Sequence, residues 1–454
     1  STSPQLFCFG HSHIDIAWLW PLAETERKCA RTFATQIELM KQYPEYRFLQ
    51  SQPHLYRMTR RLYPELYARI RKAARAGQWI AEGAMWVEAD TNISSGESLI
   101  RQCLHGKRFF KEEFGVESRL LWLPDVFGYS GAMPQILAGC GVPYFSTCKI
   151  LWTYNGGEPF PLNTFWWEGI DGTRVMAHIH YDYNSKTDPA TLITRWNERI
   201  QKNGIDARLV PFGWGDGGGG PTREHLEFLR RQRDLEGAPR ARQGSPVEFF
   251  EREIKRGTKL PVYVGELYFQ AHRGTYTTQA KTKQGNRRCE FALREAEMWG
   301  AFAQAAGSRR YPAAVMDEAW KGVLLNQFHD IIPGSSIARV YQEAEALHAK
   351  VLAEAGRVAT AAAGSLLKPD RGSVAVFNSL SWPRVELVAM PAGSSAMTQA
   401  PTQLIGGKVI PFVLGWMVGR GGQPSRLLPA LTHLHPGGFF VKGTTSSAIP
   451  GTPG

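Results

Sequence analysis

At 454 residues and 43% hydrophobic content, the chain is long enough for two or three well-packed globular domains. It contains no apolar run of about 18 residues, which argues against a membrane-spanning helix and a membrane partner. The net charge of +12 would permit an acidic partner, but the basic residues are dispersed along predicted helices, so we expect no binding to nucleic acid.

The first predicted strand, residues 6–9, leads directly into the sequence GHSHID at 10–15. Because side chains alternate along an extended segment, His11, His13 and Asp15 should point to the same side. Imidazole and carboxylate groups together suit zinc or a similar divalent ion. A pair of surface histidines beside a helix-capping aspartate is the alternative that this stretch alone leaves open.

Strands and helices alternate over the first 268 residues. After 6–9, the predicted strands are 47–52, 79–81, 120–123, 144–147, 209–212 and 262–264. The predicted helices are 24–43, 55–76, 97–114, 134–139, 190–202, 222–235 and 246–256, and a hairpin of 165–167 with 175–177 interrupts the repeat. Such alternation is typical of a parallel sheet or barrel. We therefore predict an α/β fold with a parallel (β/α) barrel-like catalytic domain at 1–268.

Polar side chains follow several of these strands, at the edge where ligands bind in such folds. Six of them come just after a predicted strand: His13, Asp15, Asp90, Asp125, Lys149 and Asp216. Chance could place one or two residues there, whereas six indicate a shared active-site face. Taken alone, Asp216 would be a turn residue in the glycine-rich loop 213–220.

From about residue 279 the alternation of strands and helices ends, and apolar residues recur at helical spacing over long stretches. Three consecutive helices, 284–307, 311–328 and 337–366, predict a three-helix bundle within residues 269–368. His329 and Asp330 lie between the second and third helix. A lone histidine there would more often be a buried core residue than a ligand, so this pair carries little weight by itself.

Composition shifts to a linker near residues 368–372, and the apolar segments 374–378 and 385–388 predict the start of a β domain. Beyond about residue 393 the chain is rich in Gly, Pro, Ser and Thr. Ordering such a segment costs about 1–2 kcal/mol per residue in backbone entropy, which little apolar surface can offset. We expect 369–454 to be an incomplete β domain with a disordered tail from 394. The alternative is that 409–414 and 439–441 pair with 374–377.

The six cysteines form no Cys-x-x-Cys pair, which suits a reducing compartment and argues against zinc held by thiolates. No signal peptide is visible at the N-terminus. We therefore expect a cytoplasmic protein, and the sequence leaves a homo-oligomer open.

Five motifs follow one another along the chain: GHSHID at 10–15 with Trp18, WLPDVFGYS at 122–130, GWGD at 213–216, HRGTYT at 272–277 and NQFHD at 326–330. Together they resemble the family 38 glycoside hydrolases, the class II α-mannosidases, and most closely the cytosolic type. The resemblance covers about residues 5–392. It implies a retaining enzyme that removes terminal α-linked mannose from oligosaccharides by double displacement.

The resemblance also implies roles for individual residues. One zinc ion, or cobalt, would be held by His13, Asp15, Asp125 and His329. Asp125 would be the nucleophile and Asp216 the general acid/base. We expect the substrate to be contacted by Trp18, Lys149, Asp90, His272 and Asp330.

These residue types fit the chemistry of a retaining glycosidase. Such an enzyme needs two carboxyl groups roughly 5–5.5 Å apart, one attacking the anomeric carbon and one protonating the leaving oxygen. A metal beside the nucleophile keeps that carboxylate ionised and can bind two sugar hydroxyls. Mannose offers an axial 2-OH cis to its 3-OH, which gives a physical reason for specificity.

Two features depart from the family. The segment 147–154 differs from the usual wording, and the β domain ends in what resembles a truncation or frameshift. Two other functions therefore stay open. One is a metal-dependent amidohydrolase or deacetylase, although no histidine follows the predicted strand 209–212. The other is an inactive, truncated mannosidase homologue that still binds sugar.

Overall fold

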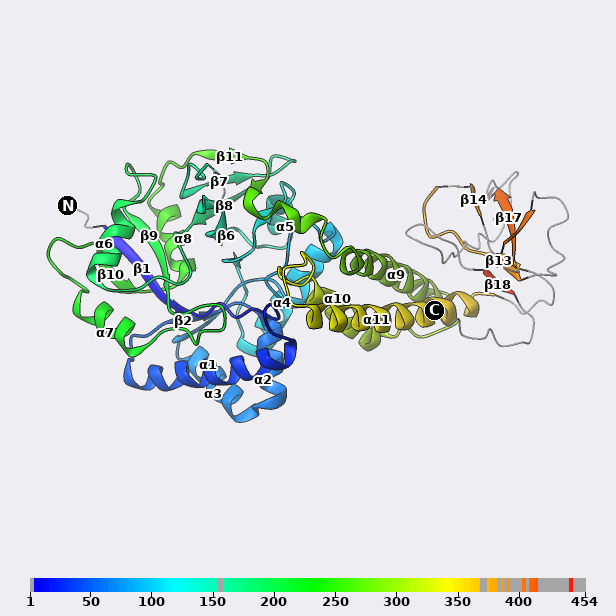
Figure 1. Ribbon diagram of the computed structural model, residues 1–454, viewed down its shortest axis with the longest axis horizontal. Coiled ribbons are helices and arrows are strands. Elements are labelled where there is room, and N and C mark those ends of the chain that lie inside the picture. The colour runs from blue at the N-terminus through cyan, green and yellow to red at the C-terminus, as the bar shows by residue number, and fades with distance from the viewer. Residues whose placement is uncertain are drawn as a thin grey trace. The chain divides into compact units, whose positions relative to one another are not determined.

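The computed structural model describes residues 4–153, 158–367 and 374–382, together with the backbone of five short strands between 385 and 443. The chain divides into two compact units (Figure 1). The first comprises residues 1–286 with 321–347, and the second comprises 287–320 with 348–454.

Two largely parallel sheets build the first unit. In one sheet β1 (Gln5–His11) pairs with β9 (Ala207–Phe212) along one edge, and with β10 (Arg240–Gln243) and then β2 (Phe48–Gln50) along the other. β3 (Trp79–Ala81) follows β2. The second sheet has the order β11 (Val262–Val264), β7 (Thr164–Glu168), β8 (Arg174–Ile179), β6 (Tyr144–Thr147) and β4 (Leu120–Trp122). Within it, only the hairpin β7–β8 is antiparallel.

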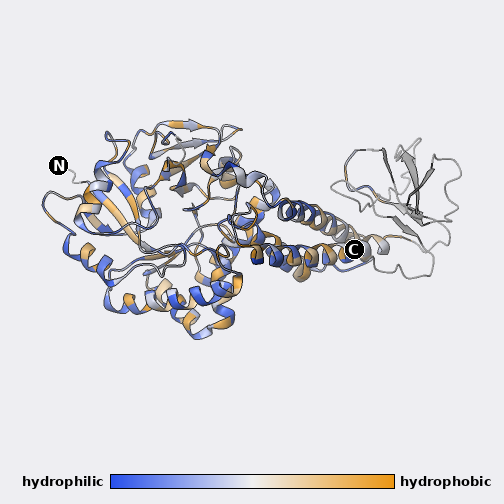
Figure 2. Cartoon of the chain, in the orientation of Figure 1, coloured by the Kyte–Doolittle hydropathy of each residue, from blue (hydrophilic) through white to orange (hydrophobic). Residues whose placement is uncertain are grey.

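A core shared by both sheets shows that they enclose one interior. Its buried side chains come from β1, β2, β4, β6, β8 and β9, and include Phe7, Phe9, Leu49, Leu120, Trp122, Tyr144, Met176 and Leu209. Side chains from all strands fill the interior of a small barrel in this way. The predicted α/β class and barrel-like arrangement are therefore confirmed. Figure 2 shows hydrophobic residues along the central strands and mixed hydropathy on the helices outside.

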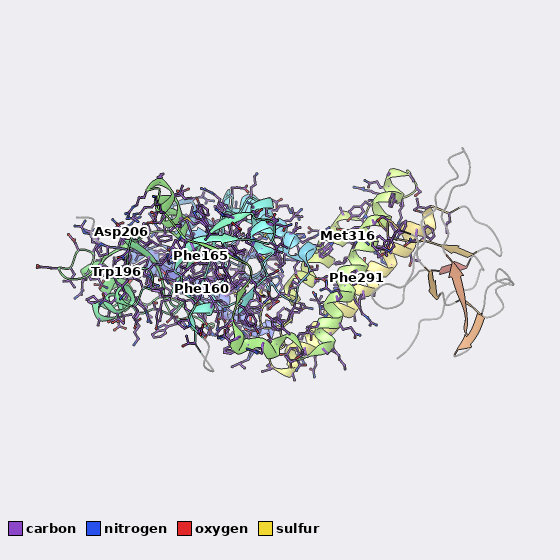
Figure 3. All side chains as sticks on the ribbon, turned by 90° about the horizontal axis from the view of Figure 1, so that it is seen from above. Phe160, Phe165, Trp196, Asp206, Phe291 and Met316 are labelled. Carbon is purple, nitrogen blue, oxygen red and sulfur yellow. The ribbon has the colours of Figure 1, made fainter. Side chains whose placement is uncertain are left out.

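Eight helices of the described residues surround these strands: α1 (Leu22–Gln42), α2 (Pro53–Leu62), α3 (Pro64–Arg75), α4 (Gly96–Phe114), α5 (Met133–Gly139), α6 (Pro189–Asn197), α7 (Arg223–Arg231) and α8 (Pro246–Lys255). The prediction of one helix over 55–76 is wrong. Pro64 has no N–H to donate, and Tyr63 before it leaves the helical region with φ −136° and ψ 63°. Figure 3 labels Phe165 of β7 and Phe160, whose ring centroids lie 5.3 Å apart.

Helix α4 fixes the segment that joins it to β3. The N–H of Trp86 donates to the carbonyl of Gln102, and the N–H of Val87 donates to the Gln102 side chain. Gly106 lies so close to this segment that a Cβ atom there would be 2.0 Å from the carbonyl oxygen of Ala84. Ala84 itself has a φ of 63°, which a residue with a side chain rarely adopts. The packing of α4 thus holds an unfavourable backbone turn just before residues 88–90.

Three long helices confirm the predicted bundle: α9 (Ala280–Ala305), α10 (Ala313–Asn326) and α11 (Ala338–Ser365). Their residues 280–286, 321–326 and 338–347 belong to the first unit and the rest to the second. Within the second unit, Trp320 of α10 donates from Nε1 to Glu297 of α9 at 2.9 Å. Phe291 and Met316 mark α9 and α10 in Figure 3. Among the described helices, none combines the length and apolarity needed to cross a membrane.

Short antiparallel strands follow the bundle, which confirms the predicted start of a β domain. β13 (Val374–Val376) pairs with β18 (Val441–Gly443). β17 (Lys408–Leu414) pairs with β14 (Val385–Leu387), β15 (Met390–Pro391) and β16 (Thr402–Ile405). Among the described residues, the alternative pairing of 409–414 with 374–377 is not present, whereas that of 439–441 is met in part, because Val441 pairs with Val376. The expectation of a disordered tail from 394 lies largely outside the described residues. The domain boundaries at 268 and 368 stay predictions.

The contact between α4 and the 84–87 segment can be tested by filling it. We expect Gly106→Ala to lower the free energy of unfolding by about 1–3 kcal/mol, because the new methyl group must displace main-chain atoms. Gly96→Ala at the start of the same helix is the matched control, since nothing lies within 4 Å of a Cβ there. Its effect should stay within about 0.5 kcal/mol. Denaturant unfolding measures both, and equal stabilities would contradict the close packing.

Candidate active site

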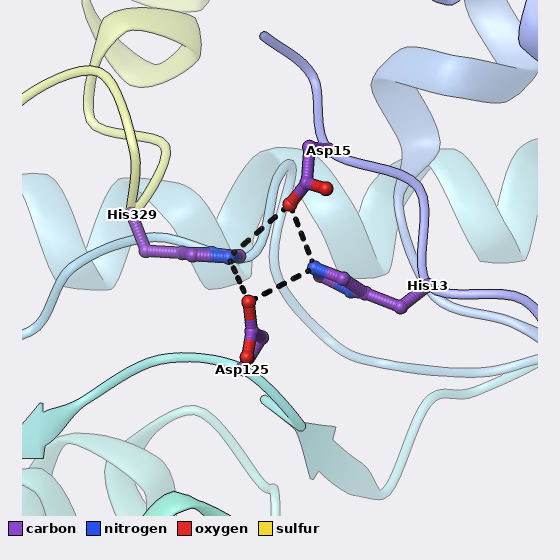
Figure 4. Close-up of side chains that lie close together, drawn as sticks. All are labelled: His13, Asp15, Asp125 and His329. Atoms are coloured by element: carbon purple, nitrogen blue, oxygen red, sulfur yellow. Dashed lines mark hydrogen bonds and ion pairs between the residues drawn. The ribbon is translucent and has the colours of Figure 1, made fainter. Parts of the chain in front are cut away.

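Four side chains from three distant parts of the chain converge in the first unit. His13 and Asp15 follow β1, Asp125 follows β4, and His329 lies in the loop after α10. Each offers one ligand-type atom, and these four atoms all lie within 4.8 Å of one another. Figure 4 shows the four side chains pointing at a common centre. The structure thus brings together the residues that sequence analysis assigned to a metal.

The distances between these atoms are short but, with one exception, too long for hydrogen bonds. His13 Nε2 lies 2.8 Å from Asp15 Oδ1 and 3.5 Å from Asp125 Oδ2. His329 Nε2 lies 3.8 Å from Asp15 Oδ1 and 3.6 Å from Asp125 Oδ2. Ligand atoms held about 2.0–2.2 Å from one tetrahedral ion are separated by about 3.3–3.6 Å. The distances of 3.5, 3.6 and 3.8 Å are close to this spacing, whereas the shorter His13–Asp15 contact would have to open when a cation binds.

The proton on His329 can be placed from its hydrogen bond. Its Nδ1 lies 2.7 Å from the carbonyl oxygen of Glu88, which can only accept, so Nδ1 carries the proton. The Nε2 atom then presents a lone pair to the carboxylates of Asp15 and Asp125. It is buried, and no hydrogen bond to it is present among the described residues; the same holds for Asp15 Oδ2. Buried acceptors that face one another are costly unless a cation lies between them.

The charge around His13 also favours a cation. Burial lowers the pKa of His13, but the carboxylates of Asp15 and Glu88 outweigh that effect and hold the pKa well above its ordinary value. The surroundings therefore favour positive charge at this imidazole. A divalent ion on Nε2 would supply that charge in place of a proton, and the two compete for the same lone pair. The donor set of two imidazoles and two carboxylates suits zinc or cobalt.

Asp125 lies in a basic environment. Lys149, at the start of the short helix η1 (Lys149–Leu151) after β6, places its Nζ 2.6 Å from Asp125 Oδ1. Burial would raise the pKa of Asp125, but Lys149, His13 and His329 together hold it well below its usual range. The Lys149 ammonium also lies 3.7 Å from the centroid of the Trp152 ring. Asp125 is thus kept ionised within the cluster.

Asp216 lies in the loop after β9 and reaches the same site through Tyr183. The Tyr183 hydroxyl donates to Asp216 Oδ1 at 3.0 Å, and the Tyr183 ring lies 5.2 Å from that of His13. Burial raises the pKa of Asp216, and Asp15 and Asp125 add to the increase against opposing effects of His13 and Tyr183. Asp216 has a φ of 50°, a left-handed conformation that Asp tolerates better than most residues.

The glycines beside Asp216 allow neighbouring groups to approach the main chain closely. The N–H of Gly217 donates to the carbonyl of His13 at 3.0 Å, which ties this loop to the loop after β1. A Cβ atom at Gly215 would lie 2.5 Å from the side-chain oxygen of Asn184 and 2.9 Å from the ring of Tyr183. A larger residue there would push Tyr183 away from Asp216.

The remaining predicted residues lie at different distances from the cluster. Asp330 is buried, with Oδ2 4.0 Å from His329 Nε2. Asp90 uses Oδ1 to accept the N–H groups of Asn92 and Ile93, which makes it the cap of a turn. The ring of His272 lies 4.8 Å from Phe127, which in turn contacts His329. The ring of Trp18 packs edge-on against Trp20.

One expectation is wrong and two site residues were missed. His11 does not join the four-residue cluster, because its Nε2 accepts from the indole of Trp122 in the barrel interior at 3.0 Å. Glu88 and Tyr183 were not singled out, although each follows a strand by the rule that identified Asp90 and Asp216. Glu88 lies 2.9 Å from His13 Nδ1. The hairpin strand β8 was treated as an interruption of the repeat, and so the residues after it were passed over.

Comparison with known proteins agrees with this architecture. The chain is 41% identical over 398 residues to alpha-mannosidase 2C1 of Homo sapiens, a match that spans 86% of this chain and 38% of that protein. It is 42% identical over 372 residues to alpha-mannosidase G of Dictyostelium discoideum, spanning 81% of this chain and 34% of that protein. The chain therefore spans little more than a third of the length of these relatives.

Solved structures show the same fold. An alpha-mannosidase from Enterococcus faecalis superimposes with a TM-score of 0.75 at 20% sequence identity, covering 85% of this chain and 46% of that one. Residues 270–366 match the alpha mannosidase middle domain. Residues 3–266 match the N-terminal domain of glycosyl hydrolases family 38, and the chain belongs to that family.

Proposed function

We propose that this chain carries the catalytic unit of a metal-dependent, retaining α-mannosidase that removes terminal mannose from oligosaccharides. The observation that carries the proposal is a pair of carboxyl groups in contrasting surroundings, one within the four-residue cluster and one next to it. Asp125 is paired with Lys149, whereas Asp216 is held by a tyrosine hydroxyl. Relatives that share 38–42% identity are α-mannosidases by name, which supports mannose as the sugar.

His13, Asp15, Asp125 and His329 would hold one zinc or cobalt ion. When bound, the ion supplies positive charge that can engage two neighbouring sugar hydroxyls and stabilise charge in the transition state. The cis 2-OH and 3-OH of mannose match that requirement. The orphaned Nε2 of His329 and the acceptor-only carboxylates are the features that support this assignment.

The two carboxyl groups would divide the chemistry between them. In the first step an oxygen of Asp125 attacks the anomeric carbon while the bond to the leaving oxygen breaks and Asp216 gives that oxygen its proton. In the second step Asp216 takes a proton from water as the water oxygen attacks the anomeric carbon and releases Asp125. Lys149 favours the ionised form of Asp125, and burial favours the protonated form of Asp216. Opposite environments for two nearby carboxyl groups are typical of such acid and nucleophile pairs.

Four further residues are proposed to contact the sugar: Asp90, His272, Asp330 and Trp18. Asp330 has the strongest structural support, because it is buried directly beside His329. For Asp90 only Oδ2 is available, since Oδ1 caps its own turn. Cytoplasmic location stays a prediction of the sequence, which leaves a homo-oligomer open.

The amidohydrolase or deacetylase alternative is disfavoured by the family match and by the position after β9, where Asp216 stands instead of a histidine. An inactive sugar-binding homologue would keep the metal and sugar contacts but release no product. Turnover of an aryl α-mannoside, set against an N-acetyl sugar and measured with and without chelator, separates the three functions.

Metal content tests the proposed ligand set. Purified protein should contain about one divalent ion per chain, and chelation should lower its melting temperature because an ion that binds only the folded state stabilises it. His329→Ala should lose most of the metal. His54→Ala is the matched control, since its imidazole lies outside the cluster and contacts Trp86 instead. Full metal occupancy in His329→Ala would contradict the assignment of His329 as a metal ligand.

Substitution of the two carboxyl groups tests their roles. Asp125→Ala should lower kcat by roughly 10⁴-fold or more on every α-mannoside, because a nucleophile is needed whatever the leaving group. Asp216→Asn should lower kcat by about 10²–10⁴-fold on an alkyl mannoside, but far less on one with a nitrophenol leaving group. Steady-state kinetics on both substrates measures the difference. If Asp216→Asn lowered kcat equally on the two substrates, Asp216 could not be the general acid.

A further inference from the structure

Glu88 touches both histidines of the four-residue cluster, one with its side chain and the other with its main chain. Its Oε2 lies 2.9 Å from His13 Nδ1, and its carbonyl oxygen lies 2.7 Å from His329 Nδ1. The residue is 2% exposed. A charged group placed so deep needs a partner of opposite charge or a hydrogen-bond donor.

The main chain around Glu88 is fixed from both sides. Ala89 and Phe328 form an antiparallel bridge, the N–H of Asp90 donates to the carbonyl of Gln327, and the N–H of His329 donates to the carbonyl of Glu88. These contacts join 88–90 to 327–329, so the loop after α10 is aligned on the loop after β3. His329 is thereby placed by the backbone of Glu88 and not by its side chain.

Two residues that follow β2 hold Glu88, one through its side chain and one through its main-chain N–H. The Ser51 hydroxyl donates to Oε1 at 2.6 Å, and the side-chain oxygen of Gln52 accepts the N–H of Glu88 at 3.1 Å. The amide nitrogen of Gln52 also donates to the carbonyl of Ile14, between His13 and Asp15. The oxygen Oε2 is left free to face His13.

A carboxylate at Nδ1 determines what the other ring nitrogen can do. Both ring nitrogens of His13 face a carboxylate, because Nε2 lies in hydrogen-bond geometry 2.8 Å from Asp15 Oδ1. When a cation takes the lone pair of Nε2 in place of that contact, the ring proton must lie on Nδ1, where the Glu88 carboxylate attracts it. Neither His13 Nδ1 nor Glu88 Oε2 makes an aligned hydrogen bond among the described residues, so the contact acts through charge. The negative charge also makes Nε2 a stronger donor to a cation.

We propose that Glu88 is a positioning residue for the divalent ion: its carboxylate sets the tautomer of His13, and its carbonyl sets that of His329. The inference rests on the proposed metal site. The Glu88 carboxylate beside His13 can be removed by substitution, whereas the Glu88 carbonyl beside His329 belongs to the main chain and stays in every variant. Side-chain variants of Glu88 should therefore weaken metal binding without abolishing it.

Titration of the metal-free protein with Co²⁺ tests this proposal, because cobalt reports both affinity and ligand geometry through its visible absorption. We expect Glu88→Ala to weaken cobalt binding by about 10–100-fold and to shift the absorption bands, since partners of ligating histidines typically contribute that much. Glu88→Gln keeps the size and an acceptor but loses the charge, so its affinity should fall between those of wild type and Glu88→Ala. Wild-type affinity and spectrum in both variants would overturn the proposal.

Glu82→Gln is the matched control for general damage. Glu82 is another buried glutamate just before the same segment, but its Oε1 accepts from Ser118 and from the N–H groups of Arg119 and Leu120. We expect this variant to lower the melting temperature and leave cobalt affinity unchanged. An equal loss of affinity in Glu82→Gln and Glu88→Gln would assign the effect to stability and overturn the proposal.

Two further cobalt titrations cover the cases in which the Glu88 variants do not fold or the wild-type protein binds no metal. If neither Glu88 variant folds, Ser51→Ala is measured instead, because it removes the hydrogen bond that holds the Glu88 carboxylate but keeps the carboxylate. A several-fold weaker affinity of this variant for Co²⁺ supports the proposal. An unchanged affinity overturns it. If wild-type protein binds no cobalt, the metal site of the proposed function is itself wrong and the inference falls with it. Wild-type binding with unaltered variants would contradict only the role of Glu88.

Discussion

The arrangement of this site depends on buried hydrogen-bond acceptors that lie close together and lack hydrogen-bond donors, among them His329 Nε2 and Asp15 Oδ2. Nε2 of His329 lies in a buried space, less than 4 Å from a carboxylate oxygen of Asp15 and from one of Asp125. Burying such groups costs several kcal/mol unless a cation lies among them. The same requirement accounts for Lys149 beside Asp125, and for the carboxylate and carbonyl of Glu88 behind the two imidazoles.

The fold meets that requirement by bringing loop after loop to one edge. Parallel strands end at the same side of a sheet, so the segments after β1, β4, β6 and β9 carry their polar side chains to neighbouring positions. His329 comes from outside this repeat and is aligned by the bridge between 88–90 and 327–329. Asp216 is fixed by Tyr183 and by the hydrogen bond of Gly217 to His13. Each loop is thus held by contacts with another loop as well as by its own strand.

Much of the fold could be predicted from the sequence, because apolar period and turn residues act locally. The strand and helix alternation, the hairpin and the three long helices all follow from such patterns. The break at Pro64 was readable too, but the continuous apolar period of 55–76 concealed it. β10 (Arg240–Gln243) was missed because its pairing to β1 lies in the main chain, whereas its side chains are mostly polar.

The site was predictable only where position after a strand and residue type coincided. Asp15 and Asp125 satisfied both conditions, whereas His329 could be assigned only through the resemblance to a family. Alternation placed His11 with His13, yet the chain leaves the extended conformation after β1 ends at His11, and that imidazole bonds to Trp122 instead. Glu88 and Tyr183 both contact His13, from which they are separated by 75 and 170 residues along the chain. No local sequence pattern encodes contacts over such separations.

Anomalous X-ray diffraction from crystals of the protein grown with zinc, collected on both sides of the zinc absorption edge, tests the central claim most directly. The account predicts one anomalous peak per chain, bonded to Nε2 of both His13 and His329 and to carboxylate oxygens of Asp15 and Asp125, at about 2.0–2.2 Å. A zinc ion bound elsewhere, with these four side chains unliganded, would contradict the account.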